Sequence, residues 1–398
     1  MKATVFGISI AISLPMHVYS AALETSNQSI ASFLQSNHYV EFSTAIVDAN
    51  VSGHTDRPTA NHSATFTETS TQDFVHDYVL SNAALKLQIQ PNWSFGIIYD
   101  QPFGANLGYA LAPIPAYQNT LINAVRLKMD THNLSTILGY QPNTAWNFYT
   151  GLSHQTLKTH LKISGQLSSI VVDYMGETKT DAAQGWLTGI SYQIPEYAFK
   201  TSITYRSKIR HKSLFHEQTN SNPTVSLFDI TSDQNTTIET PQSVNIELQS
   251  AITSHSLLYG SLRWVNWQNF KIVSPLISSD RNPLVTLVDY QNDQWSSTLG
   301  FAYRLNEHWT STLDVGWDSG TGNAASALNP SDGFYSIGLG GFYHFNTHLF
   351  IAGGIKYFQL NPAKASPNQN RSDNFWGALS SVNNNNAVAY GIKVGYRF

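Results

Sequence analysis

Apolar and polar residues alternate along most of the chain, most clearly at its carboxyl end. Successive side chains of a strand point to opposite sides, so residues 387–398 would present two different faces. One face carries Val388, Tyr390, Ile392, Val394, Tyr396 and Phe398, and the other carries Ala389, Gly391, Lys393, Gly395 and Arg397. An apolar outside with a charged inside is typical of the closing strand of an outer-membrane β-barrel, although a soluble sandwich strand also alternates.

The alternation predicts about 14 strands. They lie near 39–51, 76–90, 92–101, 123–141, 144–164, 184–194, 197–214, 237–254, 255–272, 287–304, 307–318, 334–346, 347–362 and 385–398. Many exceed about ten residues, the length that a tilted strand needs to cross a bilayer and one that sandwich strands seldom reach.

The connections between these segments alternate in length. Short ones such as Pro91-Asn92 and Asn346-Thr347 are turn sequences, and long ones lie near 52–75, 102–122, 165–183, 215–236, 273–286, 319–333 and 363–384. Short periplasmic turns alternating with long external loops are the layout of outer-membrane barrels. The sequence therefore predicts an all-β fold, a transmembrane antiparallel β-barrel with both termini on the periplasmic side.

The same pattern assigns residues to the two sides of the wall. In 197–214, lipid should meet Phe199, Ile203, Tyr205 and Ile209. In 255–272, lipid should meet Leu258, Leu262 and Trp264, and the lumen should contain Leu257, Tyr259, Arg263, Val265 and Trp267. A lumen with aromatic and aliphatic groups beside one Arg suits a ligand with a long apolar body and an acidic head better than water and ions.

The amino terminus has the features of a secretory signal. Lys2 precedes an apolar run, and small residues follow it, so residues 1–20 are interpreted as a signal peptide cut after Ser20 or Ala22. No later stretch reaches about 18 apolar residues, and no transmembrane helix is expected. Residues 21–38 would form a short amino-terminal plug, and residues 39–398 the barrel.

Composition narrows the function. Charged residues make up only 12% of the chain and aromatic residues another 12%, which fits a wall whose alternate residues meet lipid. The net charge of −4 offers no basic surface for nucleic acid, and the absence of cysteine excludes disulfides and thiolate metal sites. The His residues lack metal-ligand spacing, and the common catalytic motifs are absent. We expect no enzyme activity, no metal and no cofactor.

Several sequence segments resemble the FadL/toluene-channel family, whose members carry hydrophobic compounds across the outer membrane. The resemblance is carried by Pro241–Thr253, Leu257–Phe270 (LLYGSLRWVNWQNF), Trp93–Ala105, Leu138–Asn143, Ser202–Ser207 and Tyr396–Phe398. It implies a fourteen-stranded barrel with an amino-terminal plug called the hatch. The plug here is shortened and lacks the family's Asn-Pro-Ala, which puts hatch-controlled release in doubt. Its segment Ser29–Leu34 predicts one helical turn with Ile30, Phe33 and Leu34 on one side.

Candidate ligand-binding residues follow from the predicted lumen faces. They are Tyr259, Arg263, Val265, Trp267, Glu247 and Lys393. A cation among them would bind a carboxylate head, with Arg the better bidentate partner. The alternative is a ladder of inward salt bridges that stiffens the wall.

Two long connections and one strand end are further candidates. In 165–183, Leu167, Ile170, Val171 and Tyr174 have the spacing of an apolar helix stripe, and 215–236 adds Phe215, Leu227 and Phe228. The resemblance implies a landing groove for substrate there, and packing of the loops on each other is the alternative. Pro102 and Gly104 would break the third strand, where the resemblance implies a kink that opens a lateral exit. The alternative, which the residues favour, is a strand that simply ends in a loop.

The expected function is passive uptake of hydrophobic compounds, with long-chain fatty acids favoured over aromatic hydrocarbons. A general diffusion porin, an outer-membrane lipid hydrolase and an adhesin remain alternatives. The expected location is the Gram-negative outer membrane, as a monomer surrounded by membrane lipid and lipopolysaccharide. The barrel-assembly machinery would bind the closing strand through Phe398.

Overall fold

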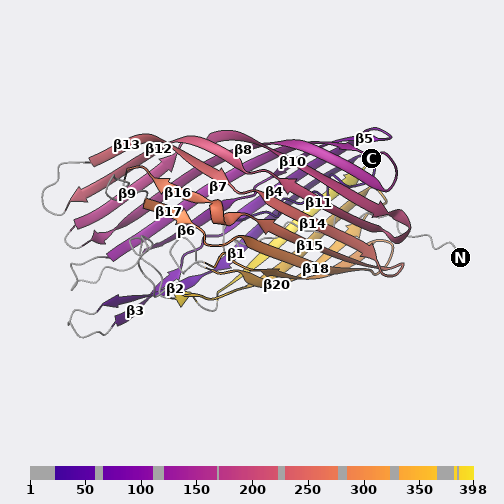
Figure 1. Ribbon diagram of the computed structural model, residues 1–398. Coiled ribbons are helices and arrows are strands. Elements are labelled where there is room, and N and C mark those ends of the chain that lie inside the picture. Colours follow the sequence, from indigo (N-terminus) through magenta and orange to yellow (C-terminus); the bar gives the residue numbers. More distant parts are fainter. Residues whose placement is uncertain are drawn as a thin grey trace.

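The computed structural model describes residues 23–58, 66–110, 121–167, 170–222, 229–276, 285–322, 331–364, 381–382 and 385–398, so the interpreted signal peptide lies outside the described residues. Fourteen strands form a closed antiparallel barrel (Figure 1). They are β1 (Tyr39–Asn50), β4 (Tyr78–Gln90), β5 (Trp93–Asp100), β7 (Leu121–Tyr140), β8 (Trp146–Leu167), β10 (Asp181–Ile194), β11 (Phe199–Arg206), β14 (Ser243–Ala251), β15 (Ser256–Val265), β18 (Gln294–Arg304), β19 (Trp309–Asp318), β20 (Phe334–His344), β21 (Leu349–Leu360) and β24 (Asn386–Arg397). The predicted fold class is confirmed.

The barrel closes between the first and the last strand. β1 pairs with β24 over its whole length, from Tyr39↔Arg397 to Asn50↔Asn386, and with β4 on its other side. Closure leaves the cylinder without an open sheet edge, as a wall in hydrocarbon requires. Tyr39 and Phe398 lie at the end with the short turns, here called the turn end, and the opposite end is called the loop end.

The predicted faces of the wall are largely confirmed. Along β24 the apolar set points outward, with Tyr390 and Ile392 about half exposed, and along β15 Leu258 and Leu262 are exposed while Arg263 and Val265 are buried. Aromatic side chains gather outside the turn end, where Trp93 packs on Tyr140 and Trp146 on Tyr192. Within the described residues, no helix is long and apolar enough to cross a membrane.

Further strands lie toward the loop end (Figure 1). They are β2 (Ser52–Pro58), β3 (Phe66–Asp73), β6 (Gly104–Ala110), β9 (Ile170–Thr178), β12 (Ile209–Asn222), β13 (Asp229–Thr240), β16 (Lys271–Ser274), β17 (Val285–Asp289), β22 (Ala363–Lys364) and β23 (Ser381–Val382); the single-turn 3-10 helices are η1 (Pro195–Tyr197) and η2 (Trp267–Asn269). Of these strands, β6, β9, β12 and β13 continue the barrel sheet, and the others form two small separate sheets.

Several predictions about strand segments were wrong. The predicted strands 237–254 and 287–304 are interrupted at residues 241–242 and 290–293. The helix predicted in 165–183 is strand β9, which pairs with β8 and β12, because partners on both sides outweigh a local helical spacing. The predicted strand 197–214 is two strands, β11 and β12, separated at Ser207 and Lys208. The break shifts the alternation, so Ile209 is buried instead of facing lipid.

Candidate functional site

Residues 23–38, here called the plug, precede β1 and fill part of the barrel interior. Ile30 and Phe33 are completely buried, and the predicted turn is present, with the Phe33 and Leu34 N–H groups donating to the Ile30 carbonyl at 3.0 and 3.3 Å. The Phe33 ring lies against Gly96 and Gly139 of the wall. A side chain at either glycine would occupy the space that the ring fills, so this pair forms the seat of the plug.

The other end of the plug lies in a break in the third barrel strand. β4 pairs with β5 only as far as Ala83↔Tyr99, and β6 resumes after residues 101–103. The Thr25 N–H donates to the Pro102 carbonyl at 3.0 Å, and the Gly104 N–H donates to the Leu23 carbonyl at 2.8 Å. The predicted strand break at Pro102 and Gly104 is present, and plug backbone supplies hydrogen bonds there.

Arg263 of β15 joins the plug to the opposite wall. Its Nε donates to Glu24 of the plug, its Nη1 to Asn245 Oδ1 at 2.6 Å and its Nη2 to Gln28 Oε1 at 3.1 Å. The guanidinium is almost completely buried, so its charge requires such partners. The carboxylate that neutralises it comes from the plug and not from the wall.

A second buried cation, Arg206 of β11, holds the same part of the plug. It donates to Ser135 Oγ at 3.1 Å and to the Gln28 carbonyl at 3.2 Å. Nearby, Asp100 accepts from Asn133 Nδ2 at 2.8 Å. Arg206 was not among the candidate residues, although the alternation of 197–206 places it on the inward face and could have identified it as a lumen residue.

The wall binds both ends of the plug turn. Glu247 accepts from the Ser29 hydroxyl and from the Ile30 N–H, the latter at 3.3 Å. Lys200 donates to the Leu34 carbonyl at 2.6 Å. A carboxylate at the amino end and an ammonium at the carboxyl end satisfy backbone groups that one turn leaves unpaired.

Lys393 lies on the other side of the plug. Its Nζ is 3.4 Å from Glu41 Oε2, and Glu41 also accepts from the Ser32 hydroxyl at 2.6 Å and the Tyr39 hydroxyl at 2.7 Å. Glu247, Arg263 and Lys393 all face the lumen as predicted, and each is engaged in contacts that fix the plug or its surroundings.

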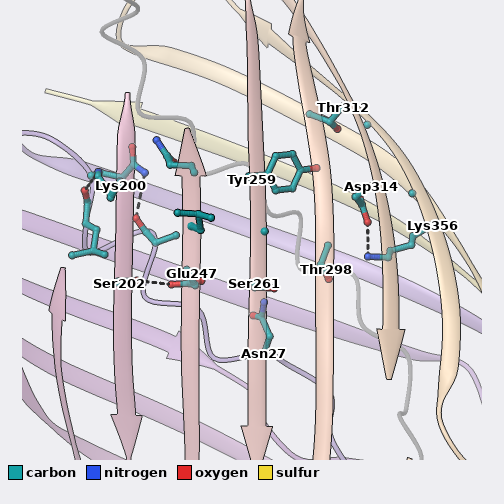
Figure 2. Close-up of a pocket in the computed structure, with 18 of the residues that line it drawn as sticks. Asn27, Lys200, Ser202, Glu247, Tyr259, Ser261, Thr298, Thr312, Asp314 and Lys356 are labelled. Carbon is teal, nitrogen blue, oxygen red and sulfur yellow. Dashed lines mark hydrogen bonds and ion pairs between the residues drawn. The ribbon is translucent and has the colours of Figure 1, made fainter. Parts of the chain in front are cut away.

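A cavity of about 1030 Å³, including space open to solvent, lies between the plug turn and the wall from β11 to β21 (Figure 2). Tyr259 and the Asp314–Lys356 ion pair, 2.6 Å long, face it from the wall. The cavity exists because many of its lining residues have small side chains or none, namely Gly260, Ser261, Thr298, Thr312, Gly338 and Gly340. The cavity borders the plug on one side.

An aromatic cluster lies on the other side of Arg263, toward the loop end. The ring of Trp267 lies 5.5 Å from Phe103, 5.2 Å from Phe270 and 5.1 Å from Tyr290, with edge-to-face geometry. Val265 is buried in the same core. Among the described residues, the buried Trp267 indole N–H has no hydrogen-bond partner.

The structure therefore separates the predicted lumen residues. Val265 and Trp267 lie in the aromatic cluster, Tyr259 lines the cavity nearer the turn end, and Arg263 stands between them along β15. Trp267 itself belongs to η2, because the strand predicted over 255–272 ends at Val265.

The candidate capture residues are only partly visible. Leu167, Ile170 and Val171 lie in β8 and β9, and Leu227 and Phe228 lie outside the described residues. Tyr174 and Phe215 point inward and are buried, and the Tyr174 hydroxyl donates to Glu217 at 2.7 Å. Within the described residues, no group of His, Asp and Glu could hold a metal ion.

Comparison with known families identifies the chain. The family model for outer membrane protein transport proteins (OMPP1/FadL/TodX) matches residues 21–398. The chain belongs to this family. The FadL/TodX family consists of outer-membrane transporters of hydrophobic compounds, and its barrel architecture makes this chain an integral outer-membrane protein.

Solved structures of FadL/TodX proteins share the fold. A Pseudomonas aeruginosa FadL homologue is 15% identical with a TM-score of 0.73, and the alignment covers 92% of each chain. The Pseudomonas putida toluene transporter TodX is 13% identical with a TM-score of 0.62, covering 97% of this chain and 99% of that one. The Ralstonia pickettii toluene transporter TbuX is 11% identical with a TM-score of 0.60, covering 97% and 96%. No curated protein matched the chain.

Proposed function

We propose that this FadL/TodX protein is a passive channel for long-chain fatty acids. The observation that carries the proposal is Arg263, a buried cation below the Trp267 aromatic cluster whose only carboxylate partner among the described residues is Glu24 of the plug. A ligand with an acidic head can replace Glu24 at the guanidinium without leaving the Arg charge unpaired.

The proposed path begins at the loop end, where the candidate capture residues of β8, β9 and β12 lie, and leads to Val265 and Trp267. The apolar chain of the ligand then replaces water at about 0.8 kcal/mol per buried methylene. Glu247, which binds the plug turn, and Glu41, which accepts from Ser32 of the plug and pairs with Lys393, would respond to displacement of the plug. No step in this path needs an energy source.

Two exits are consistent with the plug contacts. Withdrawal of Leu23–Thr25 would remove hydrogen bonds from the strand break at Pro102 and Gly104 and open the wall sideways. Movement of the plug turn would instead widen the cavity that Tyr259 lines, toward the turn end. Either exit follows release of Glu24 from Arg263. The plug that occupies the lumen is an argument against a general diffusion porin.

The test is a titration of tryptophan fluorescence in the refolded protein, with a long-chain fatty acid and its methyl ester. Glu24→Gln removes the competing charge, so the affinity for the acid should rise by on the order of tenfold more than the affinity for the ester. Arg263→Met in the Glu24→Gln background should reduce acid binding to the level of the ester. Arg304→Gln, a cation at the turn end, is the matched control and should leave both unchanged.

Other outcomes would change the assignment. Equal binding of acid and ester in every variant would discard carboxylate recognition at Arg263 and keep a channel for apolar compounds. Binding of toluene without binding of either fatty compound would make aromatic hydrocarbons the substrate. Large steady conductance with no saturable binding would favour the porin.

A further inference from the structure

A group of cations lies on the outside of the wall, just beyond its apolar belt at the loop end. Arg126 and Lys128 of β7 and Lys158 and Lys162 of β8 are exposed and point away from the barrel interior, as the alternation along both strands requires. These four residues are called the outer cationic face. The chain as a whole carries a net charge of −4, so this surface departs from the overall charge.

The height of this face follows from the residues below it on the same strands. Leu134, Leu138 and Leu152 are exposed apolar side chains of the belt, and His132, hydrogen-bonded at 2.8 Å to Tyr99, marks its upper limit. Lys128 is four residues beyond His132, which is about 13 Å along a strand and on the order of 10 Å in height for a tilted one. In outer-membrane barrels the loop end faces outward, so these cations lie at the level of the outer leaflet's headgroups.

The strand register brings like charges together. Arg126 lies directly opposite Lys162. Like charges directly opposite each other on two strands are destabilising. Such an arrangement is stabilised when an anion binds between the two side chains.

The acidic groups nearby neutralise only part of this charge. Glu177 of β9 is 2.8 Å from Lys158 Nζ and 3.8 Å from His160 Nδ1, and Asp130 is 3.6 Å from Lys128 Nζ. In the described part of the chain, Arg126 and Lys162 have no carboxylate within ion-pair distance. Arg126 and Lys162 therefore face each other without a protein carboxylate between them, and a bound anion would reduce the repulsion between their charges.

We propose that the outer cationic face binds the phosphate groups of lipopolysaccharide, the phosphorylated glycolipid of the outer leaflet. Arg and Lys suit phosphate, and Arg can bind it through two parallel hydrogen bonds. A lipid is favoured over a free anion because the face lies on the same two strands as Leu134 and Leu152 of the belt, on the order of 10 Å above it, so one lipid molecule is long enough to contact both surfaces. This inference is independent of the fatty-acid assignment.

The test measures binding of bisphosphorylated lipid A to the full-length protein in detergent, with lipid A lacking both phosphates as the comparison ligand. Wild type should bind the phosphorylated form with an affinity that falls as salt rises. Arg126→Gln combined with Lys162→Gln should weaken binding by about tenfold or more, because each cation contributes at an anionic membrane surface. Lys271→Gln combined with Arg304→Gln removes the same charge elsewhere and should change binding less than about twofold.

Three results would overturn the proposal. The first is equal binding of phosphorylated and dephosphorylated lipid A. The second is an unchanged affinity in the Arg126→Gln and Lys162→Gln variant, checked as folded by its heat-dependent shift on a gel. The third is full competition by millimolar inorganic phosphate, which would identify a site for free anions instead.

Discussion

At the scale of single residues, the charged groups of the lumen hold the plug in place. Glu24 and Arg263 are nearly inaccessible to solvent, and removing one partner of such a pair leaves an uncompensated buried charge. The complete Glu24–Arg263 pair stabilises the docked plug, whereas either residue without its partner destabilises it. A ligand carboxylate would be the one replacement for Glu24 that avoids this cost.

Arg263→Ala should release the plug while the barrel stays closed. The loss of docking free energy should be about 3–5 kcal/mol, the range for breaking a buried pair. Amide hydrogen exchange should accelerate at Thr25 and Ile30 and stay slow in β1 and β24. The double change Glu24→Gln and Arg263→Met, which leaves no unpaired charge, should release the plug less. Equal acceleration in the two variants would contradict this account.

The seat of Phe33 gives a second prediction. Gly96→Ala places a Cβ in contact with the Phe33 ring, so the ring must move and plug amides should exchange faster. Gly353→Ala, whose Cβ would lie no closer than 3.7 Å to a neighbouring atom, is the matched control and should leave exchange unchanged. Identical behaviour of the two variants would show that Phe33 does not anchor the plug.

At the scale of elements, the chain leaves the ladder of the wall at residues 101–103 and 207–208. The first break is bridged by plug backbone, and the second separates β11 from the β12–β13 hairpin that rises at the loop end. The two breaks therefore join the barrel to the plug and to the β12–β13 hairpin, the two elements that the proposed ligand path would displace.

The break in the third strand can be tested by making it more regular. Pro102→Ile combined with Gly104→Val replaces residues that disfavour a ladder with β-formers, so the wall should tend to close there. If ligand leaves sideways, uptake of radiolabelled fatty acid by cells should fall several-fold while fluorescence-detected binding is retained. Unchanged uptake would direct attention to the cavity beside the plug.

The β12 extension should weaken in acid. His211 is buried between Asp181 Oδ2 and Gln155 Oε1, each 3.1 Å from a ring nitrogen. Burial lowers the pKa of His211, with the Asp181 contacts opposing the shift. Because the folded state favours the neutral ring, stability is retained above the unfolded pKa of about 6.5 and declines as pH falls below it.

Hydrogen exchange in β12 measured at pH 7.5 and pH 5.5 would check this dependence. The acceleration at pH 5.5, beyond the intrinsic pH effect on exchange, should be smaller in His211→Gln. His216→Gln alters an exposed residue of the same strand and should keep the wild-type dependence. An equal response in both variants would exclude His211 as the group responsible.

At the scale of the whole molecule, the sequence was sufficient for the barrel and insufficient for its contents. Alternation predicted the strand count and the inward positions of Glu247, Arg263 and Lys393, since strand geometry alone determines them. The alternation gave the wrong side for Ile209, because the break at Ser207 and Lys208 shifts the inward positions by one residue and no Gly or Pro in the sequence signals this break. It could not identify Glu24 as the partner of Arg263, because that contact joins residues 239 positions apart.

Removing the plug should convert the closed barrel into a pore. A variant lacking residues 23–34 loses the side chains that fill the lumen beside the existing cavity, so ion conductance in a planar bilayer should rise well above that of wild type. The wild-type protein should conduct weakly, since the plug occupies the path. High conductance in both would mean that the plug does not obstruct ions.

The seam between β1 and β24 has a consequence for biogenesis. The first and last strands are neighbours in the cylinder, so the chain cannot close until its final residues have arrived. Loss of β24 alone would leave β1 and β21 with unpaired backbone groups in hydrocarbon, where no water can satisfy them. A truncation that removes only β24 should therefore be as damaging as one that removes several strands. The incomplete sheet would have two unpaired edges, which promote pairing with other chains. We expect such a protein to aggregate or to be degraded, and not to form a slightly smaller channel.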